Sequence, residues 1–206
     1  MAGNFQFGRV IGNRPVVSPR WRVTTGELHV AERVARVLGG APEKCGHQGS
    51  DSFDLETESP AVLVAIDGPG GISMDMRLWG PRGLTHHCDG VAYLSPEAEK
   101  GRPCGCPSSM IERRGSAKSG QGPQPNTTIT FRLPGVGDVG DFQFQSSSWK
   151  LAETVCELQC ALAAVDAPSL CELSLERVEF KTVTGRSVSY FKPVLAVGVS
   201  SVMSEI

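Results

Sequence analysis

The chain has 206 residues, of which 40% are hydrophobic and 20% are charged, and its formal net charge is -2. This length fits one large or two small domains, and the small net charge excludes binding to nucleic acids or membranes by charge alone. The sequence contains no apolar run of membrane-spanning length, and its first residues lack the apolar core of a signal peptide, so we expect a soluble, cytoplasmic protein.

The first part of the chain predicts an irregular arm, a helix and several strands. Residues 1–23 are expected to be irregular because they contain several prolines. Thr24 and Glu27 have the spacing of a capping box, which predicts a helix that ends at about Leu38, before a Gly-Gly pair. Residues 41–52 are expected to form a loop. Runs of strand character follow, separated by turn residues, at residues 53–57, 61–66 and 72–79.

The second part predicts a flexible loop, one further helix and a β-hairpin. Residues 107–126 are rich in Ser, Gly, Pro and basic residues, which favours flexibility. Ser148 can cap a helix from residue 149 to about 165. Residues 170–183 and 187–197 are rich in Val, Phe and Tyr and flank a Thr-Gly-Arg turn. Together with short strands near residues 127–133 and 141–144, this predicts an α+β fold of mostly antiparallel strands with two main helices, forming one domain over residues 1–206.

The cysteines indicate a metal site. There are seven of them and no export signal, which favours metal ligands or buried thiols over disulfides. On an extended chain His86 and Cys88 point to one side and His87 to the other. The Cys104-Gly105-Cys106 turn can bring two further sulfurs to the same ion. Because zinc takes thiolate and imidazole ligands in a tetrahedron, we predict a structural zinc at Cys88, Cys104, Cys106 and His86, in a segment at about residues 84–126.

Several alternatives to this zinc site remain open from the residues alone. The fourth ligand could be His87 or His47 instead of His86, or the cysteines could simply be buried thiols. A catalytic zinc would need an open position and a nearby base, which Asp89 and His87 could supply in a metal-dependent hydrolase. The sequence contains no H-E-x-x-H, no G-x-x-x-x-G-K-[ST] and no G-x-S-x-G, and these absences disfavour an enzyme.

The predicted second helix carries two apolar stripes. A helix that is apolar on two sides is either buried within its own domain, which we favour, or docks a partner. Cys156 and Cys160 are expected to behave as small buried hydrophobic residues. One stripe comprises Leu151, Val155, Leu158, Leu162 and Val165, and the other comprises Trp149, Ala152, Cys156, Cys160 and Ala163.

Seven segments, in this order and spacing, resemble one family. They are GRVIGN, DLETES, HHCDG, CGCP, TTITFRLPG, FQFQSSSW and LERVEFKTVTGRSVSYFKPVLAV. The chain in this respect resembles the recombination directionality factors that accompany large serine integrases in temperate phages. The resemblance implies a protein without catalytic residues, which binds a serine integrase on its attachment-site DNA and switches it from integration to excision. It also implies little autonomous DNA binding.

One departure from the family concerns the metal. Family members tend to carry a further cysteine shortly before the T-x-[LI] strand, whereas residues 122–125 here read Gly-Pro-Gln-Pro. The resemblance therefore implies that His86 or His87 completes the site, or that the site is degenerate. The runner-up to the directionality factor is a small zinc-binding nucleic-acid module, in which Arg113, Arg114 and Lys118 would supply the basic feature.

Overall fold

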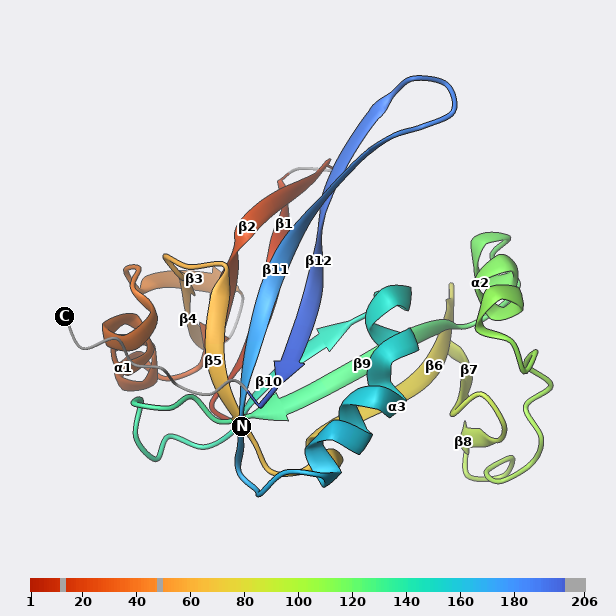
Figure 1. Ribbon diagram of the computed structural model, residues 1–206, viewed down its shortest axis with the longest axis horizontal. Helices are drawn as coiled ribbons and strands as arrows, with labels where there is room; N and C mark the ends of the chain where they lie inside the picture. Colours follow the sequence, from red (N-terminus) through yellow and green to blue (C-terminus); the bar gives the residue numbers. More distant parts are fainter. Residues whose placement is uncertain (12–13, 48–49, 199–206) are drawn as a thin grey trace. The chain divides into compact units, whose positions relative to one another are not determined.

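The computed structural model describes residues 1–11, 14–47 and 50–198, and the chain divides into two compact units (Figure 1). Unit 1 combines Met1–Gly71, Ile129–Phe144 and the chain from residue 158 onward. Unit 2 combines Ile72–Thr128 and Gln145–Glu157. The two units are described separately. The expectation of one domain over residues 1–206 stays a prediction.

Unit 1 contains the strand order β3-β4-β2-β1-β10-β9, although residues 124–128 of β9 and 145–146 of β10 are assigned to unit 2. Strand β1 is parallel to β10, whereas the pairs β1–β2, β2–β4 and β3–β4 are antiparallel. Rings from four of these strands build its core: Trp21 and Phe144 have centroids 5.0 Å apart, and Phe5 and Phe131 have centroids 5.2 Å apart. The bounds are β1 Gly3–Ile11, β2 Arg14–Thr25, β3 Glu43–His47, β4 Ser50–Glu56, β9 Gln124–Phe131 and β10 Phe142–Ser146.

Strands β1 and β2 correct the prediction of an irregular arm over residues 1–23. Phe5 pairs with Val23, and both side chains are buried, as is Trp21 two residues earlier. The period-two burial of Trp21 and Val23 is a strand signal that the neighbouring prolines obscured. The loop expected at residues 41–52 is likewise wrong where β3 and the start of β4 form a hairpin.

Helix α1, Leu28–Leu38, packs against β2 and β4. The sequence predicts its end correctly but not its start. Its end is as predicted, because Gly39 follows with a φ of 74°, in the region that favours glycine. Its start is not a capping box. The Thr24 hydroxyl instead donates to Asp54, and the Thr25 hydroxyl accepts from the backbone N–H of Glu27.

A second sheet in unit 1 has the order β12-β11-β5, entirely antiparallel. Figure 1 shows β11 and β12 as a long two-stranded ribbon, which confirms the predicted hairpin. Side chains alternate between buried and partly exposed along β11 up to Leu175, and beyond it both strands are largely exposed. The bounds are β5 Ala61–Ile66, the short 3-10 helix η1 Pro69–Gly71, β11 Ser169–Lys181 and β12 Ser187–Val197.

Unit 2 contains the strand order β9-β6-β7-β8 and helix α2. Strands β6 and β7 form an antiparallel pair, in which Met76 faces Cys88 and Leu78 faces His86. Its small core contains Met76, Cys88 and Cys104, with Tyr93, Cys106 and Trp149 packed against them. The bounds are β6 Ile72–Gly80, β7 Gly83–Cys88, β8 Tyr93–Ser95 and α2 Met110–Lys118.

Helix α3, Trp149–Ala163, starts in unit 2 and ends in unit 1. Leu151, Ala152 and Val155 are buried, as is Leu162. The second predicted stripe is not buried as a whole, because Cys156 and Cys160 are exposed. The expectation that these two cysteines act as buried hydrophobic residues is therefore wrong.

The α+β class with mostly antiparallel strands is confirmed, but the number of main helices is three in the described part of the chain. The additional helix is α2, which lies within the segment predicted to be a flexible loop. A local contact and a tertiary contact stabilise this helix. At its start the Ser109 hydroxyl accepts a hydrogen bond from the Ile111 N–H, and near its end the Ala117 side chain is buried. None of the described helices is long and apolar enough to cross a membrane.

Candidate metal centre

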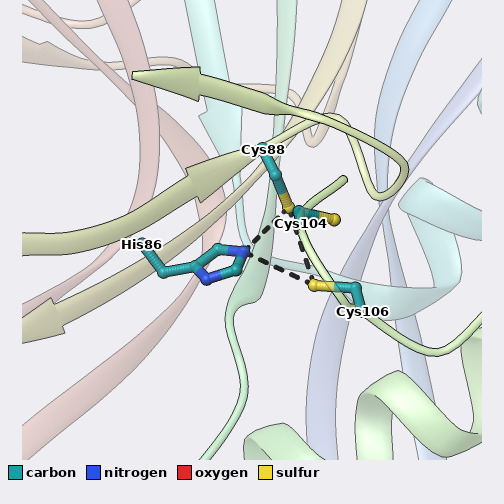
Figure 2. A group of neighbouring side chains, drawn as sticks. All are labelled: His86, Cys88, Cys104 and Cys106. Atoms are coloured by element: carbon teal, nitrogen blue, oxygen red, sulfur yellow. Dashed lines mark hydrogen bonds between the residues drawn. The ribbon is translucent and has the colours of Figure 1, made fainter. Parts of the chain in front are cut away.

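Four side chains of unit 2 lie close together, and dashed lines in Figure 2 join three of them, His86, Cys88 and Cys106. The four are His86 and Cys88 of β7 and Cys104 and Cys106 of the loop that follows β8. Their ligand atoms, one imidazole nitrogen and three sulfurs, all lie within 4.8 Å of one another. The structure thus brings together all four residues predicted as ligands, and this group could hold a metal ion.

Local backbone structure explains why these residues meet. His86 and Cys88 are two apart on a strand and so lie on the same face of the sheet. The second ligand segment is drawn to the first by a hydrogen bond of 2.9 Å from the Cys104 N–H to the Val91 carbonyl. Gly105 turns the chain between the two sulfurs with a φ of 72°, a conformation that favours glycine.

The distances among the donor atoms of His86, Cys88 and Cys106 are close to those around a tetrahedral ion. In a zinc site with Zn–S bonds of about 2.3 Å and Zn–N bonds of about 2.05 Å, two sulfurs lie about 3.8 Å apart, and a sulfur and a nitrogen about 3.6 Å apart. Here Cys88 Sγ and Cys106 Sγ are 3.7 Å apart. His86 Nε2 lies 3.5 Å from Cys106 Sγ and 3.2 Å from Cys88 Sγ.

The electrostatics of the cluster also suit a cation. Burial raises the pKa of the Cys88 and Cys106 thiols, so thiolates at these positions need a compensating positive charge. Burial lowers the pKa of His86, which favours the neutral imidazole that binds metals. The His86 ring also packs against Tyr93, with centroids 4.8 Å apart, which restricts its orientation.

His87, one of the two alternative fourth ligands, lies outside the cluster. His87 points to the opposite side of β7, where its Nδ1 lies 2.9 Å from the Ser95 hydroxyl and its Nε2 lies 3.8 Å from Asp75. His47 lies in β3 of unit 1, and its side chain falls outside the described residues.

Asp89, the candidate base of a hydrolase, has a structural task in the turn after β7. Its carboxylate accepts hydrogen bonds of 2.8 Å and 2.7 Å from the N–H groups of Ala92 and Val91. These bonds lower the pKa of Asp89. Four protein side chains around one ion would leave no position for water, an arrangement that is typical of structural metal sites.

One contributor to the site was missed by sequence reasoning. Arg113 of α2 donates from Nε to the Pro107 carbonyl and from a terminal guanidinium nitrogen to the Gly90 carbonyl at 2.8 Å. In the sequence it is one of several cations in a polar stretch, and no spacing distinguishes it from Arg114. The hydrogen bonds that orient its side chain go to carbonyls outside the helix.

Two comparisons bear on the whole chain. The family model described as Gp3-like, recombination directionality factor-like, matches residues 2–198. No solved structure matches the chain. The family match spans nearly the full sequence and includes both units and all four residues of the cluster.

Proposed function

This chain belongs to the Gp3-like family of recombination directionality factor-like proteins, and from this premise we propose that it binds a large serine integrase and switches it from integration to excision. The observation that carries the proposal is the family match over residues 2–198. The integrase, assembled on its attachment-site DNA in the cytoplasm, is the proposed partner.

The proposed mechanism is a shift between states of the integrase–DNA complex. A protein that binds one synaptic state more tightly than another shifts their equilibrium by the difference in binding free energy. A tenfold preference corresponds to about 1.4 kcal/mol, so a modest interface suffices for a directional bias. This mechanism requires no bond-making or bond-breaking by the chain itself.

We further propose that the protein is not an enzyme and that its metal is a structural zinc. Three sulfurs and one imidazole form a donor set that suits zinc. When bound, the ion would link β7 to the Cys104–Cys106 loop and stabilise this part of unit 2. The engagement of Asp89 in its turn and of His87 with Ser95 disfavours a hydrolytic role for either residue.

The test is a plasmid recombination assay with the purified integrase encoded nearest the gene. Added protein should enable recombination between the two hybrid attachment sites and inhibit recombination between the two original sites. Integrase without the protein, active on the original sites, is the control. If the protein leaves both reactions unchanged while that control is active, the proposal is wrong.

The alternative of an autonomous nucleic-acid module has less support. Of its three basic candidates, Arg113 is turned inward to the Gly90 and Pro107 carbonyls, which removes it from an exposed basic patch. A gel-shift experiment separates the two functions. We expect this protein to change the migration of attachment-site DNA only when integrase is present. Retardation of the DNA by the protein alone would favour the alternative.

A further inference from the structure

Arg113 connects the two segments that carry the metal ligands. Its guanidinium donates to the carbonyl of Gly90, two residues after Cys88, and to the carbonyl of Pro107, the residue after Cys106. One planar group therefore joins both ligand segments to α2. The fork geometry of arginine permits this double contact, whereas the ammonium of lysine presents its donors at one point.

The guanidinium group of Arg113 lies close against Gly90. Gly90 has a φ of 96°, and a Cβ atom added there would lie 2.3 Å from a terminal nitrogen of Arg113. The same terminal nitrogen lies 3.9 Å from the Met110 sulfur on the preceding turn of α2. The backbone conformation therefore favours glycine at position 90, and a side chain there would displace the guanidinium of Arg113.

Helix α2 has little else to hold it. It has nine residues, fewer than an isolated helix needs for stability in water. Ala117 is its buried residue, and Ile111 is 82% exposed. The two hydrogen bonds of Arg113 thus attach the helix to the Gly90 and Pro107 carbonyls outside it.

The charge of Arg113 also suits the position. Three thiolates, a neutral imidazole and a divalent ion carry a net charge of -1, which a nearby guanidinium stabilises.

We propose that Arg113 is the positioning residue of this metal centre, and that metal binding and the docking of α2 stabilise each other through it. The proposal rests on the metal centre proposed above. The coupling is reciprocal: if the ion favours the docked helix, the docked helix raises the affinity for the ion by the same factor.

The first experiment measures metal affinity with Co²⁺ as a spectroscopic probe and a competing chelator. Wild-type protein should show the thiolate-to-cobalt absorption of a tetrahedral site. Arg113→Lys should bind Co²⁺ about 10- to 100-fold more weakly, the usual range for groups that support metal ligands. Lys118→Met, on the same helix at an exposed position, is the matched control and should bind like wild type.

The second experiment follows amide exchange across α2. With Zn²⁺ bound, Met110–Lys118 should be protected in the wild type and lose that protection when a chelator removes the metal. Arg113→Lys should show weak protection of α2 even with Zn²⁺ present. Gly90→Ala retains Arg113 and all four ligands but places a methyl group where the guanidinium lies. It should weaken both Co²⁺ binding and the exchange protection of α2.

The outcomes distinguish the two proposals. Wild-type protein that binds no Co²⁺ would overturn the metal centre and, with it, the role of Arg113. Wild-type protein that binds Co²⁺, together with an Arg113→Lys variant that binds it equally tightly, would overturn the role of Arg113 alone. Should Arg113→Lys unfold unit 2, shown by lost exchange protection in β6, the strand that carries the buried Met76, Gly90→Ala decides by the same two measurements.

Discussion

Individual cysteines differ in their surroundings in this chain, and these differences decide what each can do. Cys88 and Cys104 are buried beside Cys106 and a histidine, where three sulfurs and a nitrogen can share one ion. Cys171 is buried in β11. Cys156 is exposed on α3 and has no role in the cluster. The same residue type therefore provides a candidate ligand, a core side chain and a surface thiol.

Cys104→Ala should remove the metal. One of four ligands is lost, and metal binding contributes directly to the free energy of local folding. Purified wild-type protein should contain about one zinc per chain by elemental analysis. Cys104→Ala should contain far less, and the matched control Cys156→Ala should keep the wild-type content. Equal zinc in all three proteins, or none in the wild type, would contradict the assignment.

Cys171 should resist alkylation. Burial raises its pKa, and because the thiolate is the nucleophile, a raised pKa lowers its reactive fraction at any given pH. At pH 8 iodoacetamide should modify Cys156 and Cys160 of the folded protein much faster than Cys171, and modification of Cys171 should speed up only on unfolding. Mass spectrometry of peptides after timed labelling measures the three rates. Comparable rates in the folded protein would show that β11 opens readily.

At the scale of whole elements, the sequence succeeds where local signals agree. The β11–β12 hairpin has β-rich flanks and a glycine turn, and the ends of α1 and α3 carry clear stop signals. Prediction from the sequence fails where a tertiary contact decides whether an element forms. Helix α2 depends on the side chain of Arg113, whose carbonyl partners lie in other segments. Strand β2 contains prolines that read as loop, yet Trp21 is completely buried within it.

Trp149→Ala should destabilise unit 2. The ring is half-buried at the start of α3, and it packs on the small core that contains Met76, Cys88 and Cys104. The expected loss in free energy of unfolding is about 2 kcal/mol, below the range of about 3–5 kcal/mol that is typical of fully buried Trp. Urea denaturation followed by circular dichroism measures it, and Cys160→Ser on the exposed side of α3 is the control. No loss would mean that the ring is a surface feature.

At the scale of the whole molecule, the sequence predicts which four side chains come together as candidate metal ligands. It does not predict which surface contacts another protein. The spacing of His86 and Cys88 and the turn at Gly105 select the four candidate ligands, because strand periodicity and glycine conformation are local. Strand periodicity favours His86 over His87 without deciding between them, and the structure places His86 in the cluster. A contact surface for another protein leaves no comparable mark in one sequence, since exposed residues are constrained only in the complex.

The directional switch should lose both of its effects together when the metal centre is removed. If one binding interaction stabilises one synaptic state, it necessarily disfavours its competitor, so activation on hybrid sites and inhibition on original sites have one cause. Cys104→Ala should therefore weaken both effects by the same factor in a titration of the plasmid assay. Loss of the metal should unfold the Cys104–Cys106 loop and so lower the fraction of protein that is competent to bind the integrase. Cys156→Ala, which keeps the cluster intact, should give wild-type curves for both reactions. The contrary result is a variant that loses activation on the hybrid sites yet inhibits recombination between the original sites at the wild-type protein concentration. That result would show that the two effects come from separate surfaces and would contradict the single-interaction mechanism.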